Sequence, residues 1–342
     1  MRARLIPVGI AFALLLVCVT VVASCGQQHA TPAPSPKLRS HDWAAVACGS
    51  DHTVALRKDG TLWAWGGNDA GQLGLGDTKE RHTPIRVGSA SDWTTVACGY
   101  ERTLALLDNG GLWTWGLNYH DDLGVGDAHD RLTPTQVGGA SDWAAVACGY
   151  DYTLAVKRDG SLWAWGSNDA GQLGLGDTKE RHTPIRVGGA SDWTTVACGY
   201  QYSLGVKNDG SLWAWGYNDG GQLGLGDTDD RHTPTRVGSA SDWAAVACGY
   251  DFGLAVKKDG SLWAWGHNYV GQLGLGDTTT RLTPSRVGTA NDWASVSCGD
   301  GDTLAAKTNG TLWAWGFNGN GELGLGDTKE RHTPTEVGSG SP

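Results

Sequence analysis

One unit of 50 residues repeats six times along the 342-residue chain, without insertion or deletion. The third copy begins DWAAVACGYDYTLAVKRDGSLWAWG, and the other copies follow it closely. The copies occupy residues 42–91, 92–141, 142–191, 192–241, 242–291 and 292–341. A period of this size predicts a solenoid, a propeller or another array in which every unit packs on its neighbours. We therefore expect residues 42–342 to form a single repeat domain.

Four short strands are predicted in each copy, at 43–48, 53–57, 61–65 and near 83–87 in the first. An Asp-Gly or Asn-Gly pair follows the second strand in every copy, as at Asp59-Gly60, and is typical of a tight hairpin turn. Pro84 favours an edge position for the fourth strand. The predicted fold is all-β: a β-propeller of six four-stranded antiparallel blades, one per repeat. Two alternatives remain for the last strand, which could complete its own blade or pair with the first.

The glycine and tryptophan content supports this interpretation. The chain has 53 Gly and 18 Trp, and every Trp lies in the repeats, three to a copy. So much glycine excludes a helical bundle. Alternation along the third strand places Trp63 and Trp65 on one face of the sheet and Leu62 and Ala64 on the other. A blade with one bulky and one smaller face packs well against its copy in the next blade.

The first residues predict an export signal. Arg2 and Arg4 precede an apolar run over residues 5–23, which ends in Ser24-Cys25-Gly26. This ending resembles a bacterial lipobox, so we expect a lipoprotein-type signal peptide at 1–24, a lipid on Cys25 and a flexible tether at 25–41. The protein would then be anchored on the outer side of the cytoplasmic membrane or in the outer membrane, through Cys25 only. A membrane-spanning anchor is the alternative.

Charge and cysteine spacing exclude other classes of function. A net charge of −10 opposes binding to nucleic acid. One Cys occurs in each copy, and no CxxC cluster of the kind that binds zinc is present, so we expect no metal or other cofactor. The repeated residues are predicted to be small buried packing residues, with disulfide pairing left open: Cys48, Cys98, Cys148, Cys198, Cys248 and Cys298.

The string from Asp77 to Pro84, which includes Arg81 and His82, carries the most chemically active side chains. Asp and Arg recur at these places in all six copies. A catalytic site needs one asymmetric group of residues, so we interpret the repeated pair as a loop brace. No catalytic residue is predicted, and the protein is not expected to be an enzyme.

Two windows differ most between the copies, and they follow the first and third predicted strands. Loops in these places emerge at the same end of an up-and-down blade. They carry aromatic side chains, which form large contacts at little entropic cost. We therefore predict one aromatic binding face made by Tyr100, Tyr119, His120, Tyr150, Tyr152, Tyr200, Tyr202, Tyr217, Tyr250, Phe252, His267, Tyr269 and Phe317.

The strings ACGYDYTLAV, KDGSLWAWG and GQLGLGD resemble the repeat of the regulator of chromosome condensation family. The resemblance implies a β-propeller, although that family usually has seven blades. It also implies possible roles: guanine-nucleotide exchange, inhibition of β-lactamase by secreted bacterial members, or light sensing as in the plant ultraviolet-B photoreceptor. The GWRHT signature of that photoreceptor is absent, since the matching stretches read CGYDYT and CGYQYS.

From these observations we expect a surface-anchored, monomeric, non-enzymatic binding propeller that presents its aromatic face to a protein partner. A glycan is the alternative ligand. The alternative functions are an enzyme acting on a cell-envelope polymer and a family-type guanine-nucleotide exchange regulator. Both lack support in the residues, because no unrepeated acid or nucleophile stands out and no basic arm is present.

Overall fold

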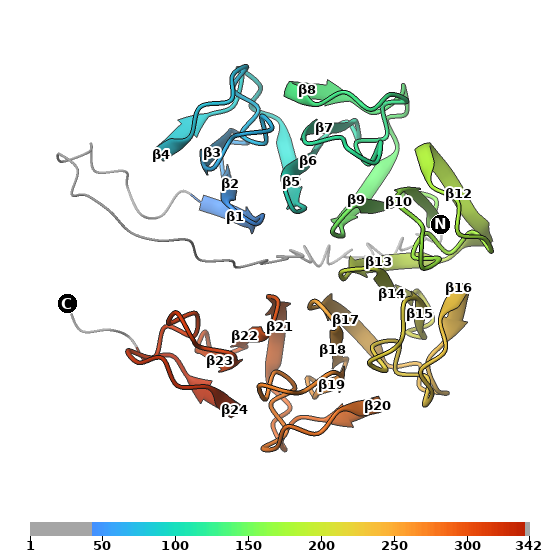
Figure 1. Ribbon diagram of the computed structural model, residues 1–342, viewed down its shortest axis with the longest axis vertical. Coiled ribbons are helices and arrows are strands. Elements are labelled where there is room, and N and C mark those ends of the chain that lie inside the picture. Colours follow the sequence, from blue (N-terminus) through green and yellow to red (C-terminus); the bar gives the residue numbers. More distant parts are fainter. Residues whose placement is uncertain (1–42, 339–342) are drawn as a thin grey trace, which may run out of the picture.

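The computed structural model describes residues 43–338, and these form six sheets arranged around a common axis (Figure 1). Each sheet has four antiparallel strands in the order of the sequence, which confirms the predicted six-bladed β-propeller. The predicted signal peptide, Cys25 and the tether lie outside the described residues. Within 43–338 there is no helix that could cross a bilayer.

The first three blades consist of β1 (Trp43–Cys48), β2 (His52–Arg57), β3 (Leu62–Gly66), β4 (Arg81–Arg86), β5 (Trp93–Cys98), β6 (Arg102–Leu107), β7 (Leu112–Gly116), β8 (Arg131–Gln136), β9 (Trp143–Cys148), β10 (Tyr152–Lys157), β11 (Ser161–Gly166) and β12 (Arg181–Ser191). The last three consist of β13 (Trp193–Cys198), β14 (Tyr202–Lys207), β15 (Leu212–Gly216), β16 (Arg231–Arg236), β17 (Trp243–Cys248), β18 (Phe252–Lys257), β19 (Leu262–Gly266), β20 (Arg281–Arg286), β21 (Trp293–Cys298), β22 (Asp302–Lys307), β23 (Leu312–Gly316) and β24 (Arg331–Glu336).

The Asp-Gly turn joins the second and third strands, as predicted. Gly60 has φ +75°, a left-handed conformation that favours glycine. The carboxylate of Asp59 accepts hydrogen bonds from the backbone N–H (3.0 Å) and the hydroxyl (2.6 Å) of Thr61. A Cβ at Gly60 would lie 2.2 Å from the carbonyl oxygen of Ser91. Both the backbone conformation and this close approach therefore require glycine.

The fourth strand lies at the outer edge of each blade, where Pro84 removes a hydrogen-bond donor without loss. The last strand behaves in the same way. β24 pairs with β23, with Arg331 opposite Gly316. Of the two alternatives, the last strand therefore completes its own blade and does not pair with the first strand.

Tryptophan binds each blade from the second to the sixth to the blade before it. Trp115, Trp165, Trp215, Trp265 and Trp315 have no exposed surface. The indole N–H of each donates to a backbone carbonyl of the preceding blade, as from Trp215 to Gln172 at 2.8 Å. The predicted packing role of the third-strand tryptophan is confirmed, and a hydrogen bond accompanies the packing.

The repeated cysteines are thiols in the described part of the chain, and all are buried except the half-buried Cys48. Burial raises the pKa of Cys148 to about 12. A thiol with so high a pKa is almost wholly protonated near neutral pH, so it is a poor nucleophile. These residues act as packing residues, in agreement with the prediction.

Five junctions join the six blades, and the sixth is open. Neighbouring blades pack through their first strands, from β1 on β5 to β17 on β21, but no packing of that extent joins β21 to β1 within residues 43–338. Figure 1 shows the two end blades apart. Val46 of the first blade is 41% exposed, whereas Val96 is 5% exposed. Leu312 of the last blade is 40% exposed, whereas Leu112 is fully buried. We call this place the open junction.

Candidate binding face

The two variable windows of each repeat meet at one end of the blade, as predicted. The backbone N–H of Gly67, which follows β3, donates to the carbonyl of Asp51, which precedes β2, at 2.7 Å. Leu117 donates to Glu101 in the same way at 2.9 Å, and the bond recurs in the later blades. These bonds hold the two loops together. Substitutions in either window therefore change the same face of the propeller.

Four tyrosines from four consecutive blades surround the axis on this face. Tyr100, Tyr150, Tyr200 and Tyr250 form what we call the tyrosine collar. Neighbouring ring centroids lie 4.7, 5.0 and 4.4 Å apart, and the last pair is stacked. The collar lines a cavity of about 340 Å³, together with Ser50, Asp51 and Asp300 and with backbone and cysteine atoms deeper along the axis. Such an aromatic hollow is the usual form of a ligand site.

The outer loops of the same face carry a second set of aromatic side chains. Tyr119 is 76% exposed, Tyr269 68% and Phe317 38%. The ring of Tyr119 lies 4.6 Å from that of His120, and the rings of His267 and Tyr269 are 4.7 Å apart. These residues follow the third strand of their blades, outside the residues that line the cavity. They form an exposed rim around the collar.

Tyr217 lies on the rim as well, and its hydroxyl donates to the carboxylate of Asp219 at 2.6 Å. This bond to a carboxylate is the main reason that the pKa of Tyr217 rises to about 12. The phenol is therefore neutral near pH 7 and its orientation is fixed by the bond.

Three predicted contact residues are internal instead. Tyr152, Tyr202 and Phe252 have no exposed surface, so the expectation that they contact a partner is corrected. The hydroxyl of Tyr152 donates to the carbonyl of Tyr202, and that of Tyr202 to the carbonyl of Phe252. Their neighbours in the next blade cover them. They connect blades, and they lie beneath the collar rather than on the face.

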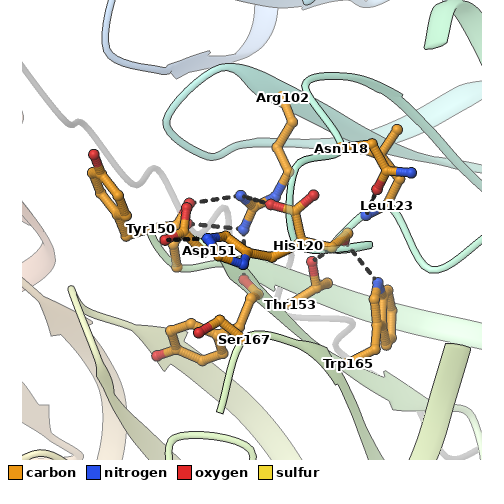
Figure 2. Close-up of polar contacts among 12 residues, drawn as sticks. Arg102, Asn118, His120, Leu123, Tyr150, Asp151, Thr153, Trp165 and Ser167 are labelled. Carbon is orange, nitrogen blue, oxygen red and sulfur yellow. Dashed lines mark hydrogen bonds and ion pairs between the residues drawn. The ribbon is translucent and has the colours of Figure 1, made fainter. Parts of the chain in front are cut away.

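Arg102 occupies the corresponding position in the second blade and is also internal. Its guanidinium donates to Asp122 at 2.5 Å and to the carbonyls of Tyr150 and Tyr152 at 2.6 and 2.7 Å. Figure 2 shows this side chain reaching toward Tyr150 and Asp151, with His120 beside them. The sequence reasoning missed this contact. Its signal was that Asp122 replaces the Gln of most copies in the same repeat that carries Arg102.

Carboxylates surround the collar. An acid directly follows the collar position in four of the six copies, the position that holds Tyr in four copies and Ser50 in the first. These acids are Asp51, Glu101, Asp151 and Asp251. Burial and the negative charges of Asp51, Asp69 and Asp130 raise the pKa of Glu101. Burial and the charge of Asp251 likewise raise that of Asp300. The face therefore has a negative electrostatic potential.

The Asp-Arg pair of each outer loop is an ion pair, as the brace interpretation predicted. The Arg81 guanidinium lies 2.8 Å from the Asp77 carboxylate, and the other five copies have the same pair at 2.6 to 2.9 Å. Asp77 also accepts the backbone N–H of Lys79 at 3.1 Å. Asn68, which occurs in every copy, was missed: its amide donates to the carbonyls of Asp77 and Lys79. Both residues fix the loop that carries the rim.

The histidines of this face lie beside carboxylates. In the part of the chain that the structure describes, no group of three His, Cys, Asp or Glu residues is placed to hold a metal ion. The His267 imidazole contacts the Asp251 carboxylate, and the His120 imidazole lies 3.9 Å from the Asp151 carboxylate. The site is an aromatic and acidic surface.

Geometry alone thus defines a repeat β-propeller with one aromatic loop face. The sequence matches the RCC1-like domain over residues 18–204 and the regulator of chromosome condensation (RCC1) repeat over 209–256, 259–306 and 309–341. The chain belongs to the RCC1 repeat family. RCC1-like propellers are in general binding or regulatory proteins, and they commonly mediate protein binding.

Individual relatives match over short stretches. The ultraviolet-B receptor UVR8 of Arabidopsis thaliana is 39% identical over 57 residues, which is 17% of this chain and 13% of the receptor. The human X-linked retinitis pigmentosa GTPase regulator is 55% identical over 38 residues, 11% of this chain and 4% of the regulator. The chain thus matches only a small part of the length of these proteins.

Solved structures match over most of the chain. Yeast RCC1 (Prp20), in a crystal structure with Kap60 bound, has a TM-score of 0.78 at 24% identity, covering 87% of this chain and 75% of that one. Human WBSCR16 has a TM-score of 0.79 at 24% identity, covering 94% and 91%. At this level of identity the likeness shows the fold alone.

Proposed function

We propose that this protein is a non-enzymatic binding propeller, and that the tyrosine collar and the rim bind a protein partner. The observation that carries the proposal is the continuous arc of four collar rings around a cavity of about 340 Å³. Tyrosines held on rigid loops lose little side-chain entropy on binding and offer both an apolar face and a hydroxyl. Tyr150 and Tyr250 are 36% and 44% exposed, so their rings are open to a ligand.

Photocrosslinking can test the face directly. A benzophenone side chain is placed at Tyr150 or Tyr269, and a control carries it at Asp209, in a turn at the opposite end of the blade. Crosslinks to one partner from Tyr150 and Tyr269, but not from Asp209, are expected in the native envelope. The variant Tyr150→Ala/Tyr200→Ala should lose capture of that partner. Equal capture by this variant, with unchanged folding by circular dichroism, would refute the proposal.

We further propose that the chain is exported and anchored by a lipid on Cys25, as the sequence from Arg2 to Gly26 indicates. Labelled palmitate should enter the protein in a bacterial host, and Cys25→Ser should abolish both the label and retention in the membrane fraction. Full labelling of Cys25→Ser would refute this assignment. A propeller held by one lipidated residue would present its loops outside the cytoplasm.

A further inference from the structure

The positions that follow each first strand break the symmetry of the ring. In chain order they are Ser50, the four collar tyrosines and Asp300, so an aromatic arc ends at an acid beside the open junction. Ser50 and Asp51 line the cavity from the first blade. One ring of equivalent positions therefore places aromatic rings and carboxylates around the same hollow.

The cavity lining contains acids and aromatic rings but no Lys, Arg or His among the described residues. The Arg102 guanidinium, which donates to the carbonyls of Gly149 and Tyr150 in the cavity lining, is 2% exposed and also binds the Asp122 carboxylate. His52 is buried too, against the hydroxyl of Thr103 at 3.0 Å. No cation of these loops is therefore directed into the collar to neutralise Asp51 and Asp300.

Aromatic faces carry a negative quadrupole and attract organic cations, most strongly where water is displaced. Carboxylates at the same opening add a direct charge attraction. An anionic group would meet only repulsion there. The chemistry of the hollow therefore selects for a cation that also has an apolar stem, which can pack along the tyrosine rings.

We propose that the collar binds a lysine or arginine side chain of a basic segment in the protein partner, an inference that rests on the function proposed above. The stem lies against the collar rings, and the cationic head faces Asp300 and Asp51. The carboxylates around the collar, Glu101 and Asp251 among them, attract the remaining basic residues of the segment. Recognition then depends on the ring faces and on the acids together.

Titration calorimetry with short oligoarginine, oligolysine and oligoglutamate peptides tests the assignment, at low and at physiological ionic strength. The two basic peptides should bind and the acidic peptide should not. Tyr150→Leu/Tyr200→Leu should weaken binding by about tenfold or more, whereas Tyr150→Phe/Tyr200→Phe, which keeps the ring faces, should weaken it much less. Equal losses in the Leu and Phe variants would refute the role of the ring faces.

Asp300→Asn gives a second and independent arm, in which affinity for the basic peptides should fall several-fold. Asp209→Asn is the matched control: it also removes one carboxylate, but at the opposite end of the blade, where two other copies have Asn109 and Asn309. Equal affinity of these two variants would overturn the role assigned to Asp300. Binding of tetramethylammonium as tightly as of the peptides would overturn the assignment to a peptide side chain.

Competition separates this inference from the proposed function. If a partner crosslinks at Tyr150 and excess oligoarginine suppresses the crosslink, both are supported. If the crosslink forms and neither basic peptide suppresses it, the binding function stands and the cationic ligand is refuted. If the peptides bind with the expected variant pattern but no protein crosslinks, the collar chemistry stands and the protein partner is refuted.

Discussion

The Arg102 guanidinium lies 2.5 Å from the Asp122 carboxylate in an ion pair in which both side chains are at least 96% buried. The two residues are replacements within one repeat, since the third and fourth copies have Tyr and Gln at these positions. A buried cation without its partner is strongly unfavourable, so each replacement makes the other necessary. The second blade thus contacts the next blade at this position through a charged guanidinium, whereas the third blade does so through a phenol hydroxyl.

Single reversions of this pair should destabilise the protein. Arg102→Tyr leaves a buried carboxylate and Asp122→Gln leaves a buried guanidinium, and each should lower the free energy of unfolding by about 3–5 kcal/mol. The double variant restores the residues of the third copy and should lose much less. Denaturant unfolding of the four proteins gives the coupling energy. Additive losses would contradict the pairing.

Tryptophans at the same repeat position should contribute different amounts to the free energy of unfolding. Trp215 is fully buried at a closed junction, so Trp215→Ala should cost about 3–5 kcal/mol. Trp65 has the same place in the first blade, faces the open junction and is only half-buried. Trp65→Ala should therefore cost less than half as much. Thermal and denaturant unfolding measure both, and equal losses would mean that the sixth junction is closed in solution.

His52 should make the protein sensitive to acid. Burial lowers its pKa from 6.5 to about 4. Between these values the unfolded chain binds a proton that the folded chain does not. The stability that neutral His52 provides is complete above pH 6.5 and is lost as the pH falls toward 4, by about 3 kcal/mol. His52→Tyr, with the residue of the third copy, should unfold with a smaller loss over this range. An unchanged pH profile would contradict the assignment.

Asp302 should make the folded protein less stable as the pH rises, which is the opposite of the pH dependence expected from His52. It is 3% exposed, and one carboxyl oxygen, Oδ2, has no hydrogen-bond partner among residues 43–338. Burial, followed by the charges of Glu322 and Asp300, raises its pKa from 3.8 to about 7. The folded chain then keeps a proton that the unfolded chain releases, so stability is complete below pH 3.8 and falls as the pH rises through 7, by about 4 kcal/mol. Asp302→Asn should gain stability relative to the wild type across this range, as urea unfolding at several pH values would measure.

The repeat allowed the architecture to be predicted almost completely. The first strand was expected at 43–48 and is observed as Trp43–Cys48, because its apolar run and the following glycine are local signals. The fourth strand was expected near 83–87 but begins at Arg81. Its start depends on the Asp77 ion pair and the Asn68 contacts, which join residues across a loop and leave no mark in the periodicity of the strand.

The sequence predicted where the binding face lies, but not which of its aromatic side chains are exposed and which are buried. Tyr150 and Tyr152 have the same chemistry and lie two residues apart, yet one is 36% exposed and the other is fully buried. The difference comes from the next blade, whose backbone covers Tyr152 and accepts its hydroxyl. Local sequence carries no information on this coverage. The open junction was equally hidden, because the end copies have nearly the same residues as the copies between them.

The open junction has a mechanical consequence. In a closed ring, any widening at one blade must be compensated at another, because the circumference is fixed. Residues 43–338 have no such closure constraint: their curvature is the sum of five junction angles. Small rotations at successive junctions therefore add up along the arc instead of cancelling. The opening within the tyrosine collar can therefore change its width to fit a ligand through small rotations at several junctions, without a change in the structure of any blade.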